Sequence, residues 1–208
     1  MDRRLIAILF TAGLVSLAVI VVSLKAISDD NSSAAQSPVV RAPASAFQGA
    51  LLPPGVRAPD FALRDQSGKQ ATMKEYRGRV VVVTFLYSHC KTECPVEAQQ
   101  IKGALDDVGH DVPVLAVSVD PPGDTPKSVN AFNRKMGMTG RLRWLLGGEN
   151  QLRRLWKGFA ILPQTPQQEH MARIVLIDRN GLQRIGFPAS QTTPERLAHD
   201  IRLLERRS

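Results

Sequence analysis

The sequence is poor in cysteine and aromatic residues, and it contains no internal repeat. Of its 208 residues, two are cysteine, four are histidine, two are tryptophan and two are tyrosine. Two cysteines allow at most one disulfide, and by themselves they do not identify a metal, because a third ligand is needed. No motif interleaves basic and aromatic residues, so the formal net charge of +8 does not indicate nucleic-acid binding. We expect an anionic membrane surface or an acidic protein partner to complement this charge.

Charged side chains are also missing from Leu5 to Leu24. That length matches the ~20 residues with which a helix spans a bilayer. Arg3 and Arg4 precede the run, which favours a cytoplasmic N-terminus and export of the remainder. A cleaved signal peptide would have a shorter apolar region and a small-residue cleavage site, which "SLKAISDD" offers poorly. We therefore predict a single-pass anchor over residues 1–26 in a bacterial cell membrane, with the rest of the chain on the periplasmic side.

The segment that follows, residues 27–56, is rich in serine, alanine, proline and aspartate. Such a composition buries too little apolar surface to fold by itself, so we predict a flexible tether. Residues 57–208 would then form the folded domain, which is a usual length for one domain. A chain that begins near Gly55 should accordingly fold cooperatively.

The folded domain is predicted to alternate strands and helices. Two short extended runs around a Ser-Gly turn in residues 60–73 indicate a hairpin, and the β-branched run over residues 79–87 is typical of a strand buried on both faces. The remaining expected elements are a helix after the second cysteine, a strand over residues 112–120, a helix from a capping Asp124 to Gly137, a short strand and helix within residues 143–161, a hairpin closed by Asp178, Asn180 and Gly181, and a helix capped by Thr193 with Pro194 in its first turn. This order predicts an α/β domain of thioredoxin-like type, with a mixed central sheet flanked by helices.

Both cysteines lie in "FLYSHCKTECPVEAQQ", residues 85–100, at the end of the first long strand. In open α/β sheets, ligands and chemistry gather at the carboxyl ends of the strands. Pro95 predicts that a helix begins there, which would put Cys94 near the N-cap and fold Cys90 back over it. Unpaired amides and the helix dipole would then favour exposed thiolates of lowered pKa. A structural disulfide would close a loop too short to constrain much, so the pair favours redox chemistry or metal binding.

A third metal ligand would have to come from the four histidines. His110 follows a helix in a polar turn and His199 lies among charged residues, so both are expected on the surface. His89 adjoins Cys90, but a neighbour in an extended segment points to the opposite side. His170 precedes the strand "ARIVLID" and follows the irregular "LPQTPQQE", where a loop could bring its imidazole over the cysteines.

Three motifs together resemble the Sco/SenC family of membrane-anchored copper proteins: "CKTECP", "SVDPPGDTP" and a histidine eight residues before the Asp of "DRNG". The resemblance runs from "APDFALRDQSGK" to the terminal helix. It implies a thioredoxin-like fold and a copper site formed by Cys90, Cys94 and His170. It also implies a role in building the binuclear copper centre of cytochrome c oxidase, as metallochaperone, thiol reductant or both. The copper-receiving subunit of that oxidase would be the partner, with other copper chaperones or thiol reductants as further candidates.

Two departures from the family pattern lie beside the histidine. "PQTPQQE" stands where the family usually has an aromatic and an acidic residue, and Met171 replaces a small hydroxyl residue. Two thiolates and one imidazole form a soft site suited to Cu(I), and zinc accepts the same ligands. The alternative function is a metal-free thiol–disulfide oxidoreductase, an enzyme that uses Cys90 and Cys94 alone as a redox dithiol. Such an enzyme has no need of His170.

Overall fold

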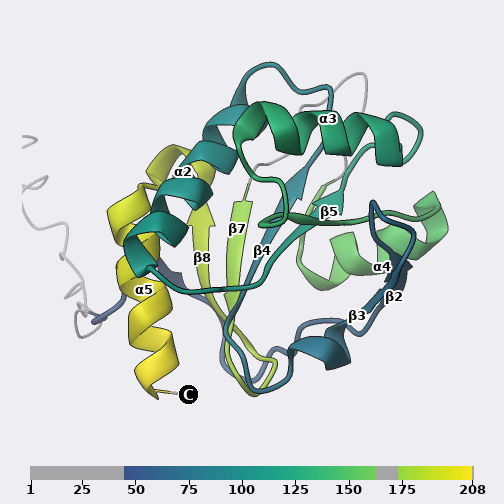
Figure 1. The fold of residues 1–208 in the computed structure, drawn as a ribbon. Helices are drawn as coiled ribbons and strands as arrows, with labels where there is room; N and C mark the ends of the chain where they lie inside the picture. The colour runs from purple at the N-terminus through teal and green to yellow at the C-terminus, as the bar shows by residue number, and fades with distance from the viewer. Residues whose placement is uncertain (1–44, 163–172, 208) are drawn as a thin grey trace, which may run out of the picture. The chain divides into compact units, whose positions relative to one another are not determined.

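Six strands form one mixed sheet in the part of the chain that the structure, a computed structural model, describes: residues 45–162 and 173–207 (Figure 1). Their order across the sheet is β1-β8-β7-β4-β5-β6. β4, β5 and β6 run parallel to one another, whereas β7, β8 and β1 join by antiparallel pairing. The strands are β1 (Ala50–Leu51), β4 (Val81–Leu86), β5 (Val114–Ser118), β6 (Arg143–Leu145), β7 (Arg173–Ile177) and β8 (Gln183–Pro188).

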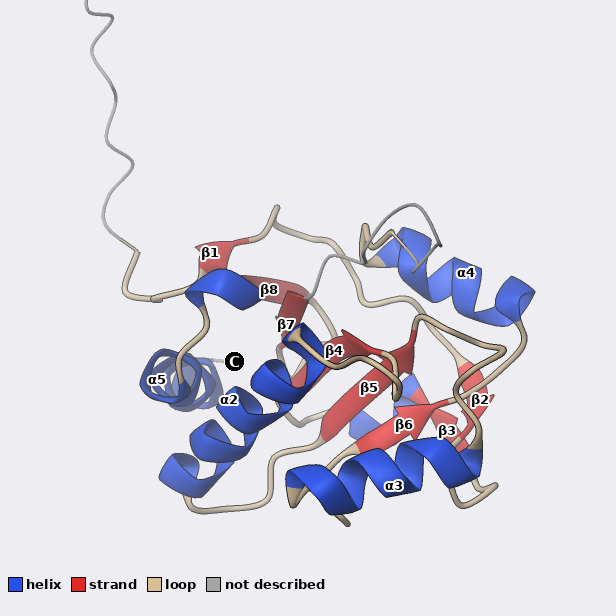
Figure 2. Ribbon diagram, turned by 90° about the horizontal axis from the view of Figure 1, so that it is seen from above, coloured by secondary structure: helices blue, strands red, loops and turns tan. Residues whose placement is uncertain are grey.

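Helices cover both faces of this sheet (Figure 2). They are α2 (Glu93–Val108), α3 (Pro126–Met136), α4 (Glu149–Gly158) and α5 (Pro194–Arg207), with short 3-10 helices η2 (Met73–Tyr76) and η3 (Ala189–Gln191). Side chains of α2, α3 and α5 pack on one face, and those of α4, η2 and the hairpin β2 (Ala62–Arg64)–β3 (Gln70–Thr72) pack on the other. This arrangement confirms the predicted layered α/β fold with a mixed central sheet.

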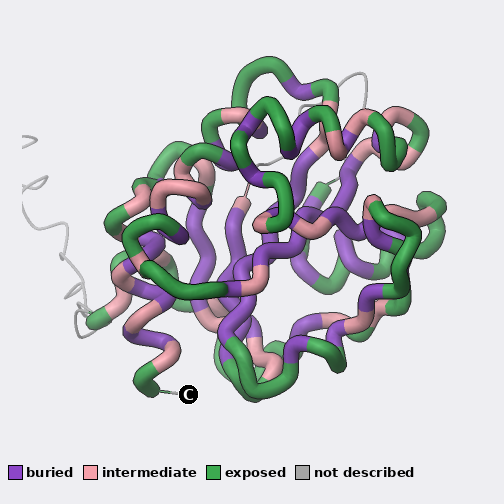
Figure 3. Tube along the Cα trace, viewed as in Figure 1, coloured by how far each residue is buried: buried purple, intermediate pink, exposed green. Residues whose placement is uncertain are grey.

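Strand β4 lies between the two layers, and all six of its residues are buried (Figure 3). Val82 and Leu86 join the core on the α2 side, while Val83 and Phe85 join the core on the α4 side. A continuous β-branched run fits a strand covered on both faces, as the sequence predicts. Thr84 is the one polar residue of the strand, and its hydroxyl donates a hydrogen bond to Glu97 on α2.

The start of α3 differs from the expectation that Asp124 caps it. Thr125 is the N-cap residue, and its hydroxyl accepts a hydrogen bond from the backbone N–H of Ser128 at 3.2 Å. The Asp124 carboxylate instead turns inward, where it accepts from the backbone N–H of Ser88 (2.7 Å) and the hydroxyl of Ser118 (2.6 Å). Either residue type can cap a helix, so the inward contacts decide the assignment.

The sheet begins within the segment predicted as tether. Ala50 and Leu51 form β1 and pair with β8. The two residues before it donate backbone hydrogen bonds to the buried carboxylate of Asp200 on α5, from Gln48 at 2.9 Å and from Gly49 at 2.8 Å. A Cβ at position 49 would overlap Ile185, so this close approach requires glycine. Residues 48–51, which lie within the stretch predicted as a tether, thus contact β8 and α5.

No helix within residues 45–162 or 173–207 is long and apolar enough to span a membrane. The predicted anchor over residues 1–26, with its apolar run over residues 5–24, lies outside the described residues. The division of the chain into anchor, tether and domain consequently stays a prediction.

Candidate functional site

The two cysteines lie where the carboxyl end of β4 leads into α2. α2 begins at Glu93, with Thr92 as its N-cap residue, rather than at Pro95 as expected. Cys94 therefore lies inside the first helical turn and not at the N-cap. Proline fits this turn because its missing N–H would have had no intrahelical partner there.

The loop before the helix folds Cys90 back over its start, as predicted. The Cys90 sulfur accepts a hydrogen bond from the backbone N–H of Cys94, with an N–S distance of 3.3 Å. The Cys90 backbone N–H in turn donates to the carbonyl of Tyr87 at 3.3 Å, which closes the turn. Both residues are thiols rather than a disulfide. The helix start thus holds one sulfur within hydrogen-bonding distance of the backbone that carries the other.

The pKa values of the two thiols are shifted in opposite directions. Burial acts to raise the pKa of Cys90, but hydrogen bonds from Cys94, Thr92 and Tyr87 outweigh it and lower the pKa below its usual value. Burial raises the pKa of Cys94, whose exposed fraction is 0%, and a negative charge on Cys90 or Glu97 raises it further. Both cysteines are buried, so the expectation of exposed thiols is wrong. The expectation of a lowered pKa holds for Cys90 only, because the helix start stabilises a thiolate there.

A buried carboxylate behind the thiols was not predicted from the sequence. Glu97 lies on α2 one turn after Cys94, and one of its oxygens accepts a hydrogen bond from the hydroxyl of Thr84 on β4. Its other oxygen, Oε2, has no hydrogen-bond partner among the described residues. Burial raises the pKa of Glu97 to about 7. The only signal in the sequence is the spacing of three residues from Cys94, which places both on one helix face.

Hydrogen bonds also fix the loop that carries Cys90. The Asp124 carboxylate joins Ser88 in this loop to Ser118 at the end of β5, and burial raises the pKa of Asp124. The Ser88 hydroxyl donates to the hydroxyl of Ser128 on α3 at 2.9 Å. The loop is therefore held from two neighbouring elements before any ligand arrives.

The three histidines of the described residues each contact a residue other than a cysteine. His110 contacts Glu205 at 2.9 Å, and His199 contacts Asp200 at 2.8 Å. His89 is exposed, and its Nδ1 lies 3.3 Å from the Ser88 hydroxyl. These placements agree with the sequence prediction for all three. His170 lies outside the described residues, and among those described no three histidine, cysteine or acidic residues gather as a metal site.

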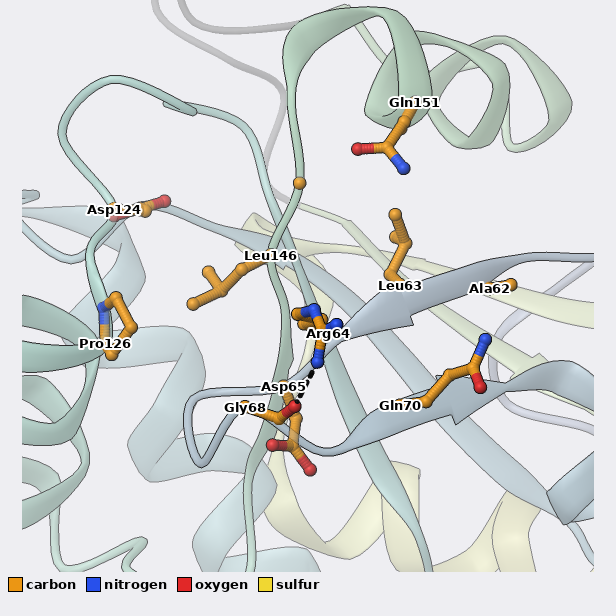
Figure 4. Close-up of a pocket in the computed structure, with 11 residues that line it drawn as sticks. Ala62, Leu63, Arg64, Asp65, Gly68, Gln70, Asp124, Pro126, Leu146 and Gln151 are labelled. Atoms are coloured by element: carbon orange, nitrogen blue, oxygen red, sulfur yellow. Dashed lines mark hydrogen bonds between the residues drawn. The ribbon is translucent and has the colours of Figure 1, made fainter.

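A separate cavity of about 550 Å³ lies between the β2–β3 hairpin, the start of α3 and the segment from Leu146 to Gln151 (Figure 4). Arg64 donates a hydrogen bond to the carbonyl of Gly68 at one side of it, at 2.8 Å. Asp124 borders this cavity, but neither cysteine does. The thiol chemistry therefore belongs to the helix start and not to this hollow.

A family model covers most of the folded part of this chain. The family model described as SCO1/SenC matches residues 53–205. The SCO1 protein homolog of Bacillus subtilis is 29% identical over 75 residues, which are 35% of this chain and 39% of that protein. The aligned segment thus spans less than two fifths of that relative's length.

Solved structures extend the similarity over most of the described residues. Bradyrhizobium japonicum ScoI with copper bound is 28% identical, covers 71% of this chain and 99% of its own, and superposes with a TM-score of 0.60. BsSco, described as a member of the Sco family of cytochrome c oxidase assembly proteins with a disulfide switch, is 20% identical, covers 76% of this chain and 98% of its own, and has a TM-score of 0.66. At that identity BsSco supports the fold alone.

Proposed function

Because this chain belongs to the SCO1/SenC family, we propose that it binds copper through Cys90, Cys94 and His170. In this proposal it acts in assembly of the binuclear copper centre of cytochrome c oxidase, as a copper metallochaperone, a thiol reductant or both. The observation that supports it most is the hydrogen bond between Cys94 N–H and the Cys90 sulfur, which keeps two thiols together at one helix start. The copper-bound Bradyrhizobium relative supports the choice of metal.

The donor set at the helix start fits a soft metal ion. Thiolates favour Cu(I) among the available ions, and copper bound here would be cargo to be handed on. Cys90 supplies a sulfur whose pKa is already lowered. Cys94 would have to lose its proton on binding, so uptake of the metal releases a proton and should strengthen as pH rises. His170 would add the nitrogen ligand from its own loop.

The unequal acidities of the thiols also favour the thiol-reductant role. A dithiol reductant needs one reactive thiolate and one partner that stays protonated until it is required. Cys90 fits the first part and Cys94 the second. In this role the Cys90 thiolate attacks a client disulfide, and Cys94 then attacks Cys90 to release the reduced client and leave a Cys90–Cys94 disulfide. A metal-free oxidoreductase would use the same two residues.

Membrane anchoring through residues 5–24 would place this site on the periplasmic side, near a membrane-bound oxidase. The copper-receiving subunit of cytochrome c oxidase is the proposed client, and other copper chaperones or thiol reductants would supply copper or electrons. Hydropathy and the flanking arginines are the support for this placement.

Anaerobic copper loading tests the proposal. The reduced full-length protein should retain one Cu(I) per chain after desalting, whereas the Cys90–Cys94 disulfide form should retain none, because its sulfurs are no longer thiolates. Cys90→Ser and Cys94→Ser should each abolish tight binding. His170→Ala should weaken binding by a smaller factor, and His110→Ala is its matched control because His110 is paired with Glu205.

The same variants separate the two roles. Unchanged copper retention in His170→Ala, or retention that survives in Cys90→Ser, would contradict the three-ligand site. A reduced wild type that fails to retain copper but still reduces a peptide disulfide would identify the metal-free oxidoreductase instead.

A further inference from the structure

A groove of about 370 Å³ opens directly beside Cys90, between the start of α2 and one side of α3. Cys90 itself lines the groove, together with Pro95 from the first turn of α2. The adjoining loop contributes Ser88 and His89. Anything bound in this groove would therefore contact the more acidic of the two thiols.

Two adjacent rows of α3 form the opposite wall. Lys127, Ala131 and Lys135 follow one another at intervals of four residues, and all three are exposed. The parallel row of Ser128, Phe132 and Met136 is closer to the core, and its two apolar members are buried. Residues four apart lie on one helix face, so the groove has an apolar floor beneath a lysine row.

Hydrogen bonds at both ends of the groove fix its two walls relative to each other. Ser88 donates to Ser128 at its loop end. At its other end the side chain of Gln99 on α2 donates to the carbonyl of Met136 on α3, at 2.9 Å. Because both ends are fixed, a ligand would meet a preformed surface and lose little free energy in ordering it.

The groove differs from other cavities of the molecule in having no carboxylate in its lining. Among its eleven lining residues, all of them described, two are lysine and none is acidic. Four other cavities in the described part of the chain each combine basic residues with at least one carboxylate: Asp65 and Asp124, Asp65 and Asp111, Asp60, and Glu149. α3 itself carries Lys127, Arg134 and Lys135 and no acidic residue. The surface beside Cys90 thus presents lysines that have no carboxylate among the residues lining the same groove.

We propose that this groove docks an acidic segment of the client protein, in which carboxylates flank the cysteine that meets Cys90. The lysine row binds the carboxylates, the Phe132–Met136 floor contacts apolar side chains between them, and the client sulfur comes within reach of the Cys90 sulfur. This inference rests on the proposed function, since it specifies the chemistry of the client. Charge complementarity of this kind raises the rate of encounter more than the final affinity.

The test uses the full-length protein in a neutral detergent. It carries the substitution Cys94→Ser, which removes the thiol that would otherwise attack the mixed disulfide at Cys90 and release the peptide. The probe is a nine-residue peptide with one cysteine between glutamates, joined as a disulfide to 2-thiopyridine. The Cys90 thiolate attacks the peptide sulfur, the bond to the thiopyridine breaks, and the thiopyridine leaves as thiopyridone, which is measured by absorbance. A second peptide has glutamine in place of each glutamate. The ratio of the two rates cancels any change in the intrinsic reactivity of Cys90.

At low ionic strength the glutamate peptide should react about tenfold faster than the glutamine peptide. The ratio should fall towards one at high salt and in the double variant Lys127→Glu/Lys135→Glu. The matched control Lys69→Glu/Lys74→Glu makes the same change in net charge at exposed lysines around the β2–β3 hairpin and should keep the ratio.

A ratio near one in the parent protein, or one unchanged by the Lys127→Glu/Lys135→Glu change, would overturn the docking proposal. A ratio near one in the parent protein, together with binding to vesicles of anionic lipid that the Lys127→Glu/Lys135→Glu change abolishes, would identify a membrane surface as the occupant and also overturn it. The result of copper loading does not depend on the ratio of the two peptide rates. A protein that retains no copper but still prefers the glutamate peptide would therefore contradict the proposed function alone.

Discussion

Helices α2 and α5 pack against each other on one face of the sheet, and each buries a carboxylate, but the two carboxylates are partnered differently. Asp200 on α5 accepts hydrogen bonds from the backbone N–H groups of Gln48 and Gly49 and contacts His199. Glu97 on α2 accepts one hydrogen bond from Thr84 and leaves Oε2 without a partner among the described residues.

The difference separates a structural region from a functional one. A partnered carboxylate compensates its own burial, and Asp200 thereby joins the segment before β1 to α5. An unpartnered oxygen costs free energy of folding, and such costs are concentrated at functional sites. Glu97 follows Cys94 by three residues, so this cost is incurred directly beside the thiols.

The largest expected effect comes from removing the segment that Asp200 holds. A chain that begins at Gly55 should fold, but it should be about 5 kcal/mol less stable than one that begins at Ser45. The deletion removes the contacts of Phe47 and Leu52 with the two cores and leaves a buried carboxylate without its backbone donors. Urea unfolding measures this difference, and equal free energies of unfolding would show that β1 contributes nothing.

The next effect isolates the carboxylate itself. Asp200→Ala should lower the free energy of unfolding by about 3 kcal/mol, because it removes the charged acceptor of the hydrogen bonds from the Gln48 and Gly49 N–H groups. Asp111→Ala is the control, since Asp111 is exposed and pairs with Arg79 on the surface. The alkylation rate of Cys90 should be the same in Asp200→Ala as in the wild type. A slower or faster rate would mean that the two regions are coupled.

Glu97→Gln should change how stability depends on pH. The pKa of Glu97 is about 7 in the folded protein, above its ordinary value of 4.5, so the unfolded chain releases this proton first. Stability contributed by the protonated carboxyl is complete below about pH 4.5 and is lost as pH rises to 7. The variant should lack this loss of about 3 kcal/mol. Urea unfolding at pH 4.5 and pH 8 measures it, and parallel pH profiles would contradict a raised pKa.

Thr84→Val should have the smallest effect, about 1 kcal/mol, because it removes the single hydrogen bond to Glu97. It should also raise the pKa of Glu97 further, since the Thr84 hydroxyl favours the ionised form. Carbon NMR of the Glu97 carboxyl reports this titration. A double variant with Glu97→Gln serves as the control, and strictly additive losses would mean that the two side chains do not interact.

Local patterns predicted most of the fold. The β-branched run of β4 and the apolar spacing of α2 appear directly in the sequence, and both elements form there. The starts of α2 and α3 were misplaced by one or two residues, because Pro95 and Asp124 each suit several positions in a first turn. Contacts with Ser88 and Ser118, which only the folded chain supplies, decide the position of Asp124.

Features that depend on contacts between residues far apart in the sequence could not be predicted from local patterns. β1 has only two residues and no pattern of its own, and its position depends on a carboxylate about 150 residues away. Glu97 resembles a solvent-facing helix residue until α2 is packed on Thr84. The thiol spacing indicated a reactive pair, whereas the burial that makes their pKa values diverge is a property of tertiary packing.

X-ray absorption at the copper edge of the Cu(I)-loaded, full-length protein tests the central proposal most directly, because it reports the atoms bound to the metal. The account predicts two sulfur ligands and one nitrogen ligand in the wild type. In His170→Ala the nitrogen ligand should be lost while both sulfur ligands remain. Fewer than two sulfur ligands in the wild type, or a nitrogen ligand retained in His170→Ala, would contradict a site built from Cys90, Cys94 and His170.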